Sequence, residues 1–571
     1  MDGPTIPSSE EIHSIKYRQV GESFREAMSR IANELSDGPD HFNAFRDILL
    51  PMKFLPAGRV QSDIGSPQGT TAFNCFVSDT IEDSMEGIMK SATNGALTMR
   101  RGGGIGYDFS TIRPRGDNIV SLDSKSSGPV SFMQIHNAVC KTVSSAGNRR
   151  GAQMAVLRVD HPDIEEFIEA KSNETEFTQF NLSVGVTDEF MEAVVKGETF
   201  DLRFAGRVLK RIDARKLWDK IMRATWDWAE PGILFLDRIN DRNNLWYCET
   251  IAATNPCGEQ PLPPDGACLL GSFNLTKYVK MDDDRYVFDN EEFIKDIPIV
   301  HRAMDNVIDR TSYPLDAQEQ EAKSKRRMGL GFTGVANTGE ALGYTYGSPE
   351  FVSWFGTMCK TLVDGLYRAS SLMAKEKGSF PVYDRQGFAN SYTYNQLEGE
   401  TQALINEHGL RNSHLTSIAP TGTISFAADN ASSGIEPVFS HEYERTVQME
   451  SGPVKMVVQD YGVREFGVRG KTADECSIQE HLAVLIEASK WMDSAVSKTI
   501  NVGQHVTWEE FKDVYMQAWL QGCKGVTTFR AAGKRYGILN VVKPKEEDDV
   551  VELAEGTACY IDPSTGKKTC E

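Results

Sequence analysis

Five consecutive residues, Asn255-Pro256-Cys257-Gly258-Glu259, bring a thiol, a carboxamide and a carboxylate together within one short run. The proline and glycine beside Cys257 predict a tight turn, from which the sulfur can project into a cavity. If the backbone is extended, residues two apart share a face, and all three reactive groups then point the same way. Asn can orient a substrate hydroxyl, and Glu can accept and return a proton. An isolated buried cysteine is usually an inert packing residue. The flanking Asn and Glu distinguish Cys257 from that case and make it a candidate catalytic residue.

Loops rich in glycine, arginine or hydroxyl groups are spread over the first three quarters of the chain, at residues 100–116, 123–129, 144–153 and 420–425. Glycine lets backbone N–H groups approach a phosphate closely, and arginine adds charge-assisted hydrogen bonds to its oxygens. The run GGGIG at 102–106 fits neither the dinucleotide fingerprint nor the phosphate loop that ends in Lys-Ser/Thr. A purely structural turn at 102–106 therefore stays as open as a ligand site.

Composition excludes several classes of function. A net charge of −20 argues against broad electrostatic binding to nucleic acid. No apolar run approaches the roughly 20 residues that cross a bilayer, and the polar, acidic N-terminus is unlike a secretory signal, so we predict a cytoplasmic protein with no membrane partner. The ten cysteines lack the paired spacing of a disulfide scaffold or zinc ribbon, and the ten histidines form no HExxH or other ligand cluster. We therefore predict no metal site in this chain.

Three regions must position these residues. Residues 1–60 carry apolar positions at helical spacing and predict a small helical N-terminal region. Residues 61–540 alternate short apolar runs with amphipathic stretches, such as FNLSVGV before DEFMEAVVKG, which is typical of an α/β body and permits a closed barrel. Residues 541–571 are acidic and poor in aromatic side chains, and we predict a flexible tail.

From about residue 50 to 540 the chain resembles the catalytic (alpha) subunit of ribonucleotide reductases. The resemblance is carried, in order, by FNCFVSDTIEDSMEGI (73–88), RRGGGIGYDFSTIRPRG (100–116), GNRRGAQMAVLRVDHPDIEEFIEAK (147–171), EPGILFLDRIN (230–240), NPCGEQPL (255–262), CLLGSFNL (268–275), RRMGLGF (326–332) and PTGTIS (420–425). It implies a ten-stranded α/β barrel with the radical cysteine on a finger loop inside it.

The resemblance assigns roles to five residues. Cys257 matches the thiyl radical that takes the 3′ hydrogen of the ribose. Asn255 and Glu259 match the residues that bind the ribose hydroxyls, with Glu259 deprotonating the 3′-hydroxyl so that the 2′-hydroxyl leaves as water. Cys75 and Cys268 match the two thiols that supply the electrons and finish as a disulfide. Their Cα atoms must then lie within about 7 Å of each other.

Further residues match the nucleotide sites of the family. Asn74 matches a substrate contact, and the loop that holds the substrate phosphates corresponds to Thr421, Gly422, Thr423 and Ser425. A deoxynucleotide or ATP effector site near a homodimer interface corresponds to Asp83, Ser84 and Arg113, and the loop that relays the effector's identity to the substrate contains Arg149 and Arg150. Coupling of this kind needs two sites and two arrangements of that loop.

Both ends of the chain carry an expectation from the resemblance. Only about 50 residues precede the matched region, so we predict that the family's N-terminal ATP cone is absent. Cys559 and Cys570 correspond to the shuttle pair that re-reduces the active-site disulfide with a thioredoxin- or glutaredoxin-like reductant. Their spacing is wider than the usual close pair, which leaves open that Cys559 alone or another thiol performs the exchange.

The source of the radical separates two branches of the family. The oxygen-dependent branch receives its radical from a small di-metal subunit through a Tyr-Tyr pair, whereas the comparable stretch here has Thr527, Thr528 and Phe529. This favours the adenosylcobalamin-dependent (class II) branch, in which the radical comes from the cofactor's carbon–cobalt bond. Tyr536 keeps the small-subunit alternative open. We expect ribonucleoside diphosphates as substrates, and a nucleotide-binding regulator that has lost the reaction is the remote alternative.

Overall fold

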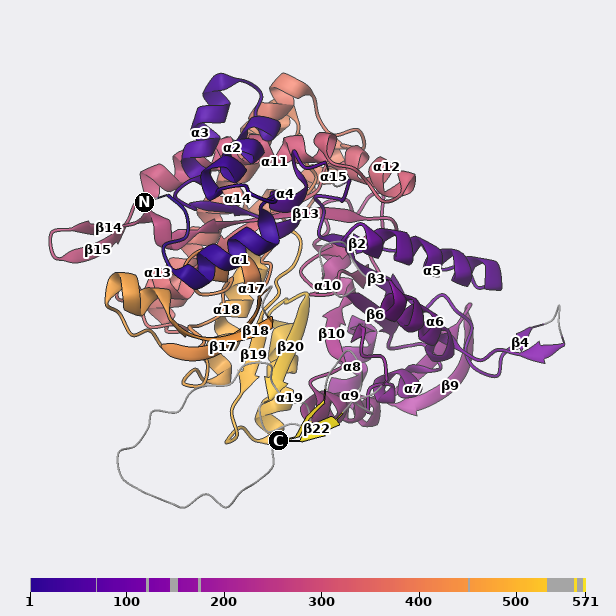
Figure 1. The fold of residues 1–571 in the computed structure, drawn as a ribbon. Helices are drawn as coiled ribbons and strands as arrows, with labels where there is room; N and C mark the ends of the chain where they lie inside the picture. The colour runs from indigo at the N-terminus through magenta and orange to yellow at the C-terminus, as the bar shows by residue number, and fades with distance from the viewer. Residues whose placement is uncertain are drawn as a thin grey trace, which may run out of the picture.

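The computed structural model describes residues 2–67, 69–119, 123–143, 152–172, 176–449, 452–530, 559–561 and 568–570. Within them the chain adopts a mixed α/β fold in which helices surround one ten-stranded sheet (Figure 1). The predicted α/β class is thereby confirmed. Arg149, Arg150 and Tyr536 lie outside the described residues.

The large sheet has one continuous path of strands. Its order is β1 (Phe54–Pro56), β13 (Ala267–Asn274), β2 (Cys75–Val77), β3 (Gly104–Asp108), β6 (Gln153–Arg158), β7 (Phe180–Val186), β10 (Gly232–Phe235), β20 (Gly525–Arg530) and β19 (Thr499–Val502), with β16 (Met328–Thr333) on the other side of β13. Neighbours from β2 through β10 pair in parallel, whereas β13 and β20 pair antiparallel to this group at its two ends.

Two isolated bridges extend the pairing beyond β16. Leu330 of β16 pairs in parallel with Thr416, and Ile418 pairs in parallel with Val496, just before β19. The segment around residues 416–418 therefore lies between β16 and the chain that leads into β19.

Helices cover the sheet from many directions (Figure 1). They are α1 (Pro7–Tyr17), α2 (Phe24–Leu35), α3 (Pro39–Leu49), α4 (Gly58–Asp63), α5 (Met85–Arg100), α6 (Pro129–Thr142), α7 (Ile164–Glu169), α8 (Asp188–Lys196), α9 (Ala214–Trp228), α10 (Leu236–Asp241), α11 (Asn290–Arg310), α12 (Asp316–Lys325), α13 (Val335–Ala341), α14 (Pro349–Lys377), α15 (Arg385–Ala389), α16 (Gly399–His408), α17 (Gly422–Ala427), α18 (Ile478–Trp491) and α19 (Trp508–Leu520). In the described part of the chain none is long and apolar enough to cross a membrane.

Local sequence explains where these elements begin and why they are buried. Helices α2, α18 and α19 each begin with a capping box, in which Ser23, Ser477 or Thr507 exchanges hydrogen bonds with a glutamate three residues later. Every residue of β13 and β16 is buried, which accounts for their continuous apolar runs rather than alternating patterns. The N-terminal region contains helices α1 to α4, and its strand β1 joins the large sheet beside β13.

In the described part of the chain, six two-stranded ribbons lie outside the large sheet. They are β4–β5 (Asn118–Ile119, Ser124–Lys125), β8–β9 (Thr199–Phe204, Arg207–Asp213), β11–β12 (Ala253–Thr254, Pro261–Leu262), β14–β15 (Val279–Asp282, Arg285–Phe288), β17–β18 (Glu442–Met449, Gly452–Gln459) and β21–β22 (Cys559–Ile561, Lys568–Cys570). The run Asn255–Glu259 connects β11 to β12 and therefore forms the tip of a hairpin.

Glycines of β3 allow this hairpin to lie against the sheet. A Cβ atom at Gly106 would stand 1.8 Å from the carbonyl oxygen of Thr254, and one at Gly104 would stand 3.0 Å from the ring of Pro256. Only a residue without a side chain permits the approach at Gly106, and the contact at Gly104 is tight. The structural interpretation of the GGGIG run therefore applies to these two glycines, because both face the hairpin.

Candidate active site

A tight turn carries the Asn-Pro-Cys-Gly-Glu run. The amide of Gly258 donates to the carbonyl of Asn255 (3.1 Å), which makes Pro256 and Cys257 the two central residues of the turn. Gly258 follows with a φ of +81°, in the left-handed region that favours glycine. Because Pro256 starts a turn, the extended arrangement that would point all three reactive groups one way is not adopted. Cys257 is exposed at the tip, whereas Asn255 and Glu259 are buried beneath it.

The hairpin tip is anchored from two sides. On one side, Asn181 of β7 donates from Nδ2 to the carbonyl of Pro256 (2.7 Å). On the other side, the carbonyl of Glu259 accepts from the Ser417 hydroxyl (3.0 Å) and from the Ala495 amide (3.0 Å). Sequence reasoning missed Asn181 and Ser417. The only available signal was a polar residue inside each of two apolar strand-like runs, FNLSVGV and LTSIAP.

Cys75 lies directly beneath the turn. The Asn255 carboxamide donates from Nδ2 to the Cys75 sulfur (3.1 Å), and that sulfur lies 3.8 Å from Oε1 of Glu259. Burial raises the pKa of the Cys75 thiol well above its ordinary value, and the nearby Glu259 carboxylate raises it further. The structure thus joins three of the predicted residues, from strand β2 and from the hairpin, in one hydrogen-bonded group.

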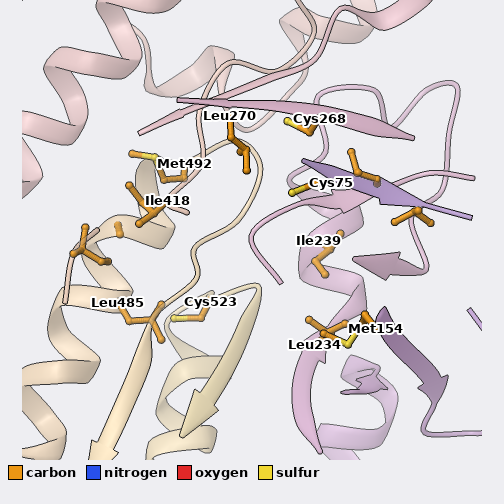
Figure 2. Packing of buried hydrophobic residues seen from close by; sticks show 14 of the residues in the cluster. Cys75, Met154, Leu234, Ile239, Cys268, Leu270, Ile418, Leu485, Met492 and Cys523 are labelled. Atoms are coloured by element: carbon orange, nitrogen blue, oxygen red, sulfur yellow. The ribbon is translucent and has the colours of Figure 1, made fainter. Parts of the chain in front are cut away.

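Cys268 lies directly opposite Cys75 on the neighbouring strand. The two residues are Cα partners in the antiparallel pairing of β13 with β2, so their side chains leave the same face (Figure 2). Val77, two residues along β2, donates to the carbonyl of its own partner Gly266 (2.9 Å), which makes the Cys75–Cys268 position a hydrogen-bonded pair as well. In such a pair the Cα atoms lie about 5.5 Å apart, within the span of about 4.4–6.8 Å that a disulfide bridges.

Both thiols stay protonated where they lie. Cys268 is fully buried, and burial raises its pKa well above the ordinary value. Nucleophilic cysteines need the opposite environment, one that lowers the pKa and produces thiolate. This pair is therefore suited to giving up hydrogen and electrons rather than to attacking as a nucleophile.

The Glu259 carboxyl combines burial with an unused oxygen. Its side chain is only 2% exposed, and burial raises its pKa from the ordinary value. Among the described residues neither Oε2 of Glu259 nor Oδ1 of Asn74, the neighbour of Cys75, accepts a hydrogen bond. Buried acceptors are rarely left without partners, so both oxygens are suited to a bound molecule that brings hydroxyl donors.

The run Thr421–Ser425 forms the start of α17 and lies apart from the turn in sequence. The Thr421 hydroxyl is already engaged, because it bonds the Thr333 hydroxyl (2.9 Å) and accepts from the Gly434 amide (2.6 Å). The Ser425 hydroxyl bonds Ser433 (2.9 Å), so it is engaged as well. Gly422 and Thr423 are exposed and remain accessible to a ligand. Ser433 and Gly434 are neighbours of this run that sequence reasoning did not find.

The predicted effector residues meet at the start of α5. Arg113 donates from Nε to Oδ2 of Asp83 (2.8 Å), and the Arg113 amide donates to Oδ1 (3.1 Å). The Ser84 hydroxyl caps α5 by accepting from the Gly87 amide (3.0 Å).

At the other end of the chain, Cys559 and Cys570 are Cα partners in the β21–β22 pairing.

Known proteins are similar in sequence to this chain along most of its length. The profile of the family described as "Ribonucleotide reductase, barrel domain" matches residues 73–470 and 467–529. The chain belongs to the ribonucleotide reductase family. The resemblance predicted from eight short runs is thereby confirmed.

Curated relatives narrow the comparison. The chain is 34% identical to the "Vitamin B12-dependent ribonucleoside-diphosphate reductase" of Mycobacterium tuberculosis, over 92% of this chain and 76% of the relative. It is 33% identical to the protein of the same name from Thermoplasma acidophilum, over 96% of this chain and 74% of the relative. A "Vitamin B12-dependent ribonucleotide reductase" from Streptomyces clavuligerus is 28% identical, over 95% and 64% respectively.

Proposed function

We propose that this chain is an adenosylcobalamin-dependent ribonucleoside-diphosphate reductase, which reduces ribonucleoside diphosphates to 2′-deoxyribonucleoside diphosphates. The observation that carries the proposal is the meeting of Asn255, Glu259 and Cys75 under the exposed Cys257, with Cys268 opposite Cys75. The names of the curated relatives support the diphosphate substrate and the cofactor.

In the proposed reaction each residue has one task. A thiyl radical on Cys257 takes the 3′ hydrogen of the ribose, and Glu259 accepts the proton of the 3′-hydroxyl. The 2′-hydroxyl takes up one proton and leaves as water, Cys75 and Cys268 together give two protons and two electrons and become a disulfide, and Glu259 returns its proton to the 3′ oxygen. The 3′ hydrogen then returns from Cys257, which restores the radical. The sum is ribonucleotide plus dithiol giving deoxyribonucleotide, disulfide and water.

The electrostatics of the site support these tasks. A general base works best when its pKa lies near the operating pH, and burial moves Glu259 in that direction. Asn255 bonds the Cys75 sulfur and so holds the thiol next to the carboxyl. The raised pKa values of Cys75 and Cys268 keep both hydrogens on the sulfurs until they are needed.

We also propose the family's architecture: a closed ten-stranded barrel over residues 61–540, with the β11–β12 hairpin as its finger loop. The two bridges at Thr416 and Ile418 support closure, because they link β16 to the chain that enters β19. The close packing of Gly104 and Gly106 against the hairpin supports an inserted loop. The helical region 1–60 and the tail 541–571 complete the proposed domains.

The residues around Cys257 fit a radical source that contacts the thiol directly. Cys257 is exposed, a Cβ at Gly258 would meet nothing within 4 Å, and the exposed Asn181 lies beside the turn. These residues would line the face that receives adenosylcobalamin, which when bound supplies a carbon radical from its carbon–cobalt bond. The small-subunit alternative is less favoured, because β20 has Thr527, Thr528 and Phe529 where a tyrosine pair would relay the radical.

Nucleotides complete the proposal. Gly422 and Thr423 would bind the substrate phosphates within the loop that Thr421 and Ser425 hold in shape, and Asn74 would contact the substrate. A deoxynucleotide or ATP would bind at Asp83, Ser84 and Arg113, with Arg149 and Arg150 relaying its identity. The exposed apolar residues of α5, which are Met85, Met89 and Leu97, support a homodimer interface beside the effector site.

The tail would supply reducing equivalents. The opposite positions of Cys559 and Cys570 in the β21–β22 pairing support a shuttle pair that exchanges with the Cys75–Cys268 disulfide. A thioredoxin- or glutaredoxin-like protein in a cytoplasmic setting would then regenerate the tail thiols. Serine at both tail positions is expected to abolish turnover with thioredoxin and to spare turnover with dithiothreitol.

Cofactor dependence tests the proposal. The protein is incubated with cytidine diphosphate and dithiothreitol, with and without adenosylcobalamin, and deoxycytidine diphosphate is measured by chromatography. We expect product only with the cofactor. Product that needs an added metal-containing subunit instead would overturn the cofactor assignment, and nucleotide binding without any reduction would favour the inactive regulator.

A further inference from the structure

The N-terminal segment of the chain packs on the proposed phosphate loop. Helix α1 lies against α17, which begins within the run Thr421–Ser425 and contains its last four residues (Figure 1). The hydroxyl of Ser9, a fully buried residue of α1, donates to the carbonyl of Phe426 (2.5 Å). This hydrogen bond joins residues 417 positions apart in the chain, so it is a tertiary contact of the loop and not part of its local structure.

A second contact lies just beyond α17. Oδ1 of Asp429 accepts from the backbone amides of Thr5 (2.6 Å) and Ile6 (3.2 Å), and Asp429 is 1% exposed. Asp429 and Asn430 have φ values of +63° and +57°, in the left-handed region that aspartate and asparagine tolerate better than other non-glycine residues, and surrounding contacts hold two such residues in a row. The N-terminal amides supply part of that constraint.

Apolar packing surrounds these hydrogen bonds. A small cluster, separate from the main core, consists of Ile12, Tyr17, Phe426, Ala427, Tyr443 and Val458. It joins α1 to α17 and to the β17–β18 ribbon. The Tyr443 hydroxyl also donates to Oδ1 of Asn430 (2.7 Å), so the β17–β18 ribbon also contacts the turn at Asp429 and Asn430.

The two ends of the phosphate loop are thus held by different parts of the molecule. Thr421 is fixed from inside by Thr333 and Gly434. The far end, at Phe426 and Asp429, is fixed by the N-terminal segment. If only the far end were loosened, the ligand would have to order the loop when it binds. The entropy cost of that ordering would weaken the binding of the ligand.

We propose that the segment Thr5–Tyr17 is a positioning element for the substrate phosphates, which sets the affinity for the nucleotide's diphosphate through Ser9 and Asp429. The inference rests on the proposed function of the run Thr421–Ser425. It concerns substrate binding and not the radical chemistry, because the Cys257 turn has its own anchors at Asn181, Ser417 and Ala495.

Two substitutions, Asp429→Gly and Ser9→Ala, weaken the contact between the N-terminal segment and the end of α17 without straining the backbone. Asp429→Gly removes both acceptor bonds and tolerates the left-handed conformation, whereas Asp429→Asn keeps an acceptor oxygen and tolerates that conformation too. Ser9→Ala removes the bond to Phe426. Ser36→Ala is the matched control, because Ser36 makes a similar hydroxyl-to-carbonyl bond (2.6 Å to Ala32) away from α17. Thermal unfolding of each variant checks that the fold is retained.

Calorimetry then compares deoxycytidine diphosphate with deoxycytidine, and steady-state assays give KM and kcat for cytidine diphosphate. For Asp429→Gly and Ser9→Ala we expect roughly three- to tenfold weaker diphosphate binding and a matching rise in KM, since each removes one or two hydrogen bonds that hold the loop. Deoxycytidine binding and kcat at saturation should stay unchanged, and Asp429→Asn and Ser36→Ala should resemble the wild type.

Unchanged diphosphate affinity in both variants, or equal weakening for the nucleoside, would overturn the inference. The proposed function is tested separately by the wild-type protein. If the wild type reduces cytidine diphosphate and binds the diphosphate more tightly than the nucleoside, the phosphate site stands whatever the variants do. If it binds both ligands equally, the phosphate site itself fails and the inference fails with it.

Discussion

Replacing Gly106 by alanine is a direct way to move the catalytic turn without touching a reactive group. The added Cβ would stand 1.8 Å from the carbonyl oxygen of Thr254 and 2.9 Å from its carbon. Both atoms are backbone, so no side-chain rotation relieves the overlap. Ordinary contact requires about 3.4 Å, and the hairpin or strand β3 must therefore shift by about 1.5 Å.

A displacement of about 1 Å in a catalytic group lowers the rate on the order of 100-fold. We therefore expect Gly106→Ala to reduce kcat by at least about 100-fold, with a loss of roughly 1–3 kcal/mol in the free energy of unfolding from overpacking. Gly104→Ala should be milder, because its Cβ would lie 3.0 Å from the ring of Pro256. Gly399→Ala is the control, since a Cβ there meets nothing within 4 Å.

The assay measures deoxycytidine diphosphate formation with adenosylcobalamin and dithiothreitol, beside denaturant unfolding and the rate at which Cys257 is alkylated. The expected order of activity is wild type and Gly399→Ala first, then Gly104→Ala, then Gly106→Ala. A folded Gly106→Ala protein with more than half of the wild-type kcat would refute the reasoning that β3 sets the position of the turn.

Other predictions concern single groups of the site and one buried lysine. Burial raises the pKa of Glu259, so kcat/KM should fall on acidification with a midpoint above the ordinary glutamate value of about 4.3, and Glu259→Gln should abolish turnover and with it that profile. One turnover without external reductant should remove two thiols, mapped by mass spectrometry to Cys75 and Cys268; loss of any other pair would contradict the assignment. Ser417→Ala, which releases the Glu259 carbonyl, should lower kcat about three- to tenfold, and an unchanged kcat would count against that anchor. Burial lowers the pKa of Lys524 to about 7, so between about pH 7 and about pH 10 the unfolded chain binds more protons than the folded chain. Over that range the free energy of unfolding of the wild type should therefore rise with pH relative to that of Lys524→Met. Parallel curves of unfolding free energy against pH for the two proteins would exclude this coupling.

Much of the fold and the family could be read from the sequence because both depend on local pattern. Helical spacing of apolar side chains predicted a helical N-terminal region, and short apolar runs such as FNLSVGV, which forms β7, predicted the strands of an α/β body. The ordered matches around Cys257 and Cys75 predicted the family, which the comparisons confirm. The register of Cys75 with Cys268 does not follow from any local pattern, since it depends on pairing between strands almost 200 residues apart.

The rest depends on tertiary geometry that no local pattern encodes. The sequence leaves the 102–106 run open between a ligand site and a structural turn, and Gly104 and Gly106 make room for the hairpin that the chain forms 150 residues later. The anchors Asn181 and Ser417 looked like ordinary polar residues of strands, because the carbonyls they bond belong to a distant turn. The hydroxyls of Thr421 and Ser425 resembled phosphate ligands, although protein groups already bond both of them.

The central claim is that Cys257 carries the radical for ribonucleotide reduction, and a single comparison tests it most directly. Wild-type protein and Cys257→Ala are incubated with cytidine diphosphate, adenosylcobalamin and dithiothreitol, and deoxycytidine diphosphate is quantified. Because Cys257 is exposed at the turn, its replacement should leave the fold and nucleotide binding intact. We predict product from the wild type and none from the variant. Deoxycytidine diphosphate formed by Cys257→Ala at a comparable rate would contradict the account.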